Sequence, residues 1–136
     1  MNMYAKRVVM ALGLGIVFAF VDIYLTGTMN PEVWDTSGPF FWYMFLSRAP
    51  IGFFVGLLGV VTQHPLLQFI HMRYLRGIGV GIILSLGLAA SAFYDDGTTW
   101  GTFWMIVGMG ALYGLIIDAV VTHLVGDGKR MLSYEA

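Results

Sequence analysis

KRVVMALGLGIVFAFVDIYL, residues 6–25, opens with two cations and then continues through residues 8–25 with Asp22 as its single charge. An α-helix rises about 1.5 Å per residue, so this run has roughly the length needed to cross about 30 Å of hydrocarbon. It is long for the apolar part of a signal peptide, and no convincing cleavage site follows it. We therefore predict a retained transmembrane helix over 8–25.

Three further apolar runs follow, over 40–61, 77–94 and 100–125. The whole chain is 58% hydrophobic and 11% charged, with a mean hydropathy of +0.78. That composition leaves too little polar surface to cover a water-soluble domain of 136 residues. The sequence thus predicts an all-α membrane protein, a single integral membrane domain over 1–136 with four transmembrane helices in a compact bundle.

The Lys and Arg residues predict the orientation of these helices. Six of them lie in three connecting or terminal segments: Lys6 and Arg7, Arg73 and Arg76, and Lys129 and Arg130. The other two connections, 26–39 and 95–99, contain acidic residues and no Lys or Arg. Short loops rich in Lys and Arg stay in the cytoplasm, so we expect cytoplasmic N- and C-termini and, as the location, the bacterial inner (cytoplasmic) membrane.

Composition and motifs exclude several classes of function. The chain has no cysteine, which removes disulfides and thiolate chemistry. Its net charge is −1, which gives no reason to expect binding to nucleic acid. It contains no phosphate-binding loop and no hydrolase or metalloprotease motif. We therefore expect a protein that is not an enzyme, with no catalytic residue and no metal site.

The segment 65–76, between the second and third runs, is too short and too polar to span a membrane. Its apolar residues recur at helical spacing on one side. We predict a short cytoplasmic interfacial helix here, in which Arg73 and Arg76 contact lipid headgroups at about 1 kcal/mol each. A helix that docks a partner is the alternative.

Small residues recur at every fourth position in each run, which predicts where the helices pack. In lipid such rows let two backbones approach closely and gain dispersion contacts. The rows comprise Ala11, Gly15 and Ala19; Gly52 and Gly56; Gly77, Gly81, Ser85 and Ala89; and Gly110 and Gly114.

The two halves of the chain resemble each other. Segments 53–64 and 111–123 both pass through Val-Val-Thr to a histidine, and the small-residue rows of the first and third runs superpose at one constant offset. Two tandem hairpin repeats are one interpretation, and chance similarity between apolar segments is the other. A repeat would place His64 and His123 at equivalent cytoplasmic helix ends.

Three charged residues lie within the runs, and all three fall on packing faces: Asp22, Arg48 and Asp118. Depth along the helices allows Asp22 and Arg48 to meet, either as an ion pair between the first two helices or as a step in a permeation path. By the same count Asp118 lies too far from Arg48, and we expect no basic residue within its reach. We expect its neighbours among Thr122, His123 and His64, and hypothesise a proton-linked site or a contact between subunits.

His64 and His123 are also candidate axial ligands for a haem or a chlorophyll-type ring. The ligands of a buried ring normally lie deeper than the membrane interface, however. That depth favours the alternative, in which interfacial histidines bond to headgroups, water or Asp118, and no cofactor is present.

Two main functional classes remain. The first is a non-catalytic subunit of a larger membrane complex, with energy-transducing complexes among the candidates, in which wide apolar faces pack against other proteins. The second is a small homo-oligomeric transporter or channel that uses Asp22, Arg48 and Asp118. The expected partners are membrane lipids and other membrane subunits, or further copies of the chain.

Overall fold

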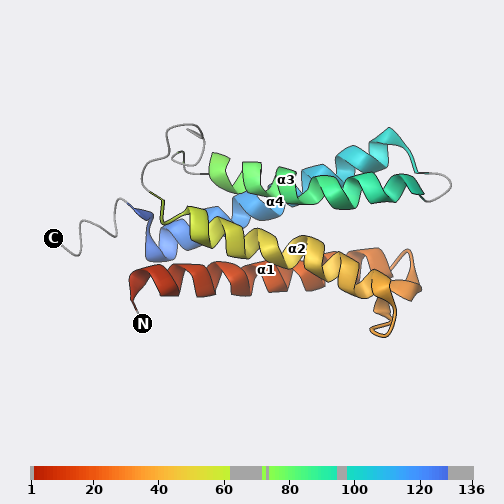
Figure 1. The fold of residues 1–136 in the computed structure, drawn as a ribbon, viewed down its shortest axis with the longest axis horizontal. Helices are drawn as coiled ribbons and strands as arrows, with labels where there is room; N and C mark the ends of the chain where they lie inside the picture. The colour runs from red at the N-terminus through yellow and green to blue at the C-terminus, as the bar shows by residue number, and fades with distance from the viewer. Residues whose placement is uncertain (1, 62–71, 73, 95–97, 129–136) are drawn as a thin grey trace.

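The computed structural model describes residues 2–61, 72, 74–94 and 98–128 (Figure 1). Within these residues the chain is all-helical and contains no strand. The elements are α1 (Met3–Gly27), η1 (Pro31–Trp34), α2 (Pro39–Leu58), α3 (Leu75–Ser91), η3 (Ala92–Tyr94) and α4 (Trp100–Val125). By length and composition, four of the described helices are long and apolar enough to cross a membrane, the third counted as Leu75–Tyr94.

The first two helices have boundaries that differ from the predicted ones, and capping residues mark the ends that differ. The first helix begins at Met3, ahead of the predicted residue 8, because the side chain of Asn2 accepts a hydrogen bond from the backbone N–H of Ala5 at 2.8 Å. Lys6 and Arg7 therefore belong to α1. The second helix ends at Leu58 and is capped by Gly59, so it is shorter than the predicted 40–61.

The predicted interfacial helix lies mostly outside the described residues, which omit 62–71 and 73. The end of that segment is described, and it belongs to a different element from the one expected. Leu75 and Arg76 form the beginning of α3, which therefore starts two residues before the predicted 77.

The four helices form two antiparallel hairpins that lie side by side (Figure 1). One hairpin joins α1 to α2, and the other joins α3 to α4. The end of the bundle at which α1 begins and α4 ends is called the basic end below, because Arg7 and Arg76 lie there. The other is called the opposite end.

Glycines let α1 and α2 approach closely. A Cβ atom added to Gly15 would lie 2.9 Å from the Cα atom of Gly52. One added to Gly56 would lie 2.9 Å from the Cβ atom of Ala11. Nonbonded carbon atoms normally keep about 3.5 to 4.0 Å apart, so a larger side chain at these positions would force the helices apart.

The α3–α4 hairpin has the same construction. A Cβ atom on Gly81 would lie 2.6 Å from the carbonyl carbon of Gly110, and one on Gly114 would lie 2.8 Å from the carbonyl carbon of Gly77. These glycines belong to the small-residue rows of the sequence. Each hairpin is thus built on backbone contacts between small residues.

Apolar side chains fill the space between the two hairpins. Five of them, from α2, α3 and α4, are at most 5% exposed: Ile51, Val55, Val80, Ile117 and Val121. Much of this apolar core lies between two groups of charged side chains, one toward each end of the bundle.

Candidate functional site

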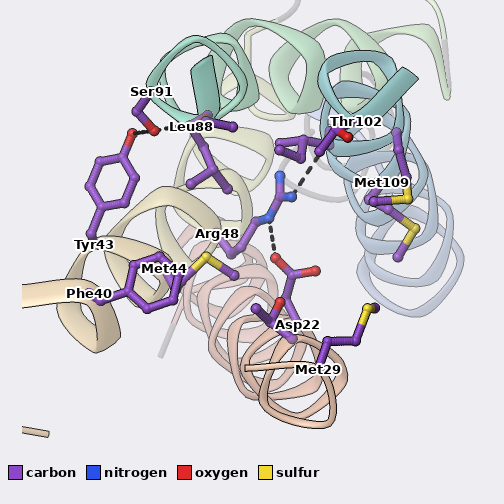
Figure 2. Close-up of a pocket in the computed structure, with 14 residues that line it drawn as sticks. Asp22, Met29, Phe40, Tyr43, Met44, Arg48, Leu88, Ser91, Thr102 and Met109 are labelled. Atoms are coloured by element: carbon purple, nitrogen blue, oxygen red, sulfur yellow. Dashed lines mark hydrogen bonds and ion pairs between the residues drawn. The ribbon is translucent and has the colours of Figure 1, made fainter. Parts of the chain in front are cut away.

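The group nearer the opposite end is centred on Arg48, whose side chain is 2% exposed (Figure 2). Its Nε atom donates to Oδ2 of Asp22 on α1 at 2.7 Å. Its Nη1 atom donates to the hydroxyl of Ser85 on α3 at 2.6 Å, and Nη2 donates to the carbonyl oxygen of Ile106 on α4 at 3.3 Å. One side chain of α2 therefore bonds to all three other long helices.

Asp22 has a second partner that completes this group. The hydroxyl of Tyr113 on α4 donates to Oδ1 of Asp22 at 3.0 Å. The ring of Tyr113 lies 5.6 Å from the guanidinium carbon of Arg48 and stacks on Phe18 at a centroid distance of 4.8 Å. We call Asp22, Arg48, Ser85 and Tyr113 the Arg48 cluster. It places the negative and positive groups in contact, as charges removed from water require.

The second group lies at the basic end and is centred on Asp118, which is fully buried. Its Oδ1 atom accepts from Nη2 of Arg7 at 2.9 Å and from Nη2 of Arg76 at 2.5 Å. The hydroxyl of Thr122 lies 3.2 Å from the same oxygen and can donate to it. We call Arg7, Arg76, Asp118 and Thr122 the Asp118 cluster. It connects α4 to α1 of the other hairpin and to α3 of its own.

Two predictions from the sequence are therefore wrong. Asp118 has basic residues within reach, because α1 extends back past Arg7 and α3 begins before Arg76. Arg76 also does not present its guanidinium to headgroups, since it is 2% exposed and bound to Asp118. Arg73, the other predicted headgroup contact, lies outside the described residues.

The Asp118 cluster continues toward the end of α4. A guanidinium nitrogen of Arg7 donates to the carbonyl oxygen of Gly126, the residue that follows α4. Asp127 interacts electrostatically with Arg7. Arg7 therefore interacts with two carboxylates, Asp118 and Asp127, and bonds the beginning of α1 to the end of α4.

The remaining predicted residues lie as follows. Thr122 contacts Asp118 as expected from the i, i+4 spacing, whereas His123 is exposed on the last turn of α4. His64 falls outside the described residues. In the described part of the chain, no three His, Asp or Glu side chains come together as metal ligands would.

A cavity of about 460 Å³ reaches the Arg48 cluster from the opposite end. Figure 2 shows Arg48 and Asp22 among the side chains that line it. The wall is mainly apolar and includes four methionines: Met29, Met44, Met105 and Met109. This volume is within the range of small-molecule sites, roughly 300 to 1,000 Å³.

Comparison with protein-family models, with curated proteins and with solved structures finds no match to this chain.

Proposed function

We propose that this protein is a non-catalytic integral membrane subunit of a larger membrane protein complex, with energy-transducing complexes as the first class to examine. In this proposal the four helices span the bacterial inner membrane, and the basic end faces the cytoplasm. The apolar character of the outer surface supports this. Each long helix exposes large apolar side chains, for example Val17, Leu46, Ile83 and Leu112, all at least 46% exposed.

The observation that carries the proposal is the position of three glycines. Gly13 on α1, Gly87 on α3 and Gly108 on α4 face open space, and a Cβ atom added to any of them would meet nothing within 4 Å. Glycine inside a helix costs about 0.5 to 1 kcal/mol relative to alanine. The inward glycines avoid a clash with a neighbouring helix, whereas at these three a Cβ atom would meet no atom of the described residues. A helix of another subunit that approaches closely would supply it.

The buried charges support a structural role for the bundle itself. Both clusters bond helices of the two hairpins to each other. Between them lie Ile51, Val80 and Ile117, and the described part of the chain has no polar side chain along this stretch. A single bundle therefore offers no polar route from one cluster to the other.

Affinity purification from native membranes tests this proposal. The wild-type chain and the volume-conserving control Leu46→Ile are expected to purify with the same discrete partner proteins. Gly13→Leu, Gly87→Leu and Gly108→Leu should fold normally, because the added side chains enter open space, yet at least one of them should reduce partner recovery at least tenfold. Full recovery of the partners with all three glycine variants would contradict the proposal.

A homo-oligomeric transporter or channel is the second candidate, and the cavity that reaches Asp22 and Arg48 favours it. Transport would require a route past Ile51, Val80 and Ile117 to Asp118. Purification as a homogeneous oligomer that conducts ions or solute in liposomes would support this candidate over the first.

The pigment interpretation through His64 and His123 stays a prediction. A visible absorbance spectrum of protein from native membranes tests it, and a featureless spectrum would contradict it. The tandem-hairpin duplication also stays a prediction.

A further inference from the structure

We propose that the cavity at the opposite end binds a neutral, lipophilic molecule with a carbonyl hydrogen-bond acceptor, of the quinone type, and that Arg48 donates to that carbonyl. This inference rests on the cavity and on the Arg48 cluster that the cavity reaches, and it does not depend on the subunit proposal. Ligand sites typically combine an apolar wall with a few convergent polar groups, and this cavity has both.

Arg48 retains unused hydrogen-bond donors at the cavity. A guanidinium carries five N–H bonds. Three of them are used, toward Asp22, Ser85 and the carbonyl of Ile106. One N–H remains on each Nη atom, on a side chain that lines the cavity and is 2% exposed (Figure 2). A ligand acceptor that reaches one of these remaining N–H bonds would gain a charge-assisted hydrogen bond.

The charges of the Arg48 cluster determine which kind of hydrogen-bond acceptor fits the cavity. Arg48 is already neutralised by Asp22, whose second oxygen accepts from Tyr113. A ligand carboxylate would lie beside the carboxylate of Asp22, and a ligand cation would face the guanidinium. A neutral carbonyl accepts the free N–H bonds without either repulsion.

The wall of the cavity suits a flat, apolar ring with a tail. Leu88, Ile106 and Phe40 line it together with the four methionines. Methionine side chains are flexible and polarizable and make favourable contacts with aromatic rings. Thr102 and Ser91 add hydroxyl groups to this lining.

Binding of 2-decyl-1,4-benzoquinone to the protein in lipid nanodiscs tests the inference, with empty nanodiscs as the background. We expect saturable binding at one site per chain. 4-Decylbenzoate and decylbenzene carry the same decyl chain on a six-membered ring, the first with a carboxylate and the second with no acceptor, and they should bind at least tenfold more weakly. Equal binding of all three probes would show a groove for acyl chains and would overturn the proposal.

Two matched variants on α4 locate the site. Met109→Trp fills the cavity and should weaken quinone binding at least tenfold, whereas Leu112→Trp lies on the same helix outside the lining and should leave it unchanged. If Met109→Trp does not fold, Met105→Trp, which substitutes a lining residue that is 59% exposed, replaces it. Unchanged binding in the folded cavity variant would overturn the proposal.

The infrared spectrum of the bound quinone supplies the chemical readout. Donation from Arg48 should move its carbonyl stretch to lower frequency than in the same quinone dissolved in lipid. An unshifted carbonyl band with saturable binding would place the molecule in the cavity without the bond to Arg48, and would overturn the proposed recognition.

Discussion

Replacing Asp118 with Leu is expected to lower the free energy of unfolding by about 3 to 5 kcal/mol, because it removes one partner of a buried ionic group. Asp118 is fully buried and accepts from both Arg7 and Arg76 through one oxygen. Leu has a similar size but offers no acceptor. Both guanidinium groups would then lose their shared acceptor inside the bundle.

Unfolding in mixed micelles, followed by circular dichroism, measures this loss. Asp118→Asn keeps an acceptor oxygen but loses the charge, so it should fall between Leu and the wild type. Glu32→Leu is the matched control, because Glu32 is an exposed carboxylate and its loss should cost less than about 0.5 kcal/mol. A wild-type unfolding curve for Asp118→Leu would show that the Asp118 cluster contributes nothing to the fold.

Enlarging Gly114 is expected to separate α3 from α4. A Cβ atom there would meet the backbone of Gly77, with the carbonyl carbon at 2.8 Å, and backbone cannot move aside as a flexible side chain can. Gly114→Ala should therefore cost about 1 to 3 kcal/mol, and Gly114→Leu should cost more or prevent folding.

Gly108 on the same helix provides the control, since a Cβ atom there meets nothing within 4 Å. In the purified chain Gly108→Ala should be neutral or stabilise by up to about 1 kcal/mol, because alanine is the better helix former. The same unfolding assay compares the two alanine variants. Equal stability of Gly114→Ala and Gly108→Ala would contradict the close approach of α3 and α4.

The four helices could be predicted because long apolar runs separated by charged or turn-forming segments have few other solutions. The pairing of Asp22 with Arg48 could also be predicted, because the depth of a residue in a transmembrane helix follows from its number of residues from the helix end. Ser85 and Tyr113, the other members of that cluster, were not identified as partners. Their contacts depend on how one hairpin sits against the other, which periodicity within a helix does not encode.

The two arginine partners of Asp118 were missed, although the sequence carried a signal for one of them. Arg7 stands four residues before Ala11 and continues the row of Ala11, Gly15 and Ala19, all of which are buried on α1. Because Lys6 and Arg7 were assigned to the segment before the first helix, Arg7 was not recognised as a member of this buried row. The cavity had no comparable signal, because it depends on side-chain packing among all four helices.

A double-mutant cycle on Asp22 and Arg48 tests most directly the claim that oppositely charged side chains buried in the bundle stabilise it as bonded pairs. Asp22→Leu and Arg48→Leu should each cost about 3 to 5 kcal/mol, because each leaves the other charge buried without its partner. The double variant should cost at least about 2 kcal/mol less than the sum of the two. If the two costs instead add to within about 0.5 kcal/mol, the two residues act independently and the account is wrong.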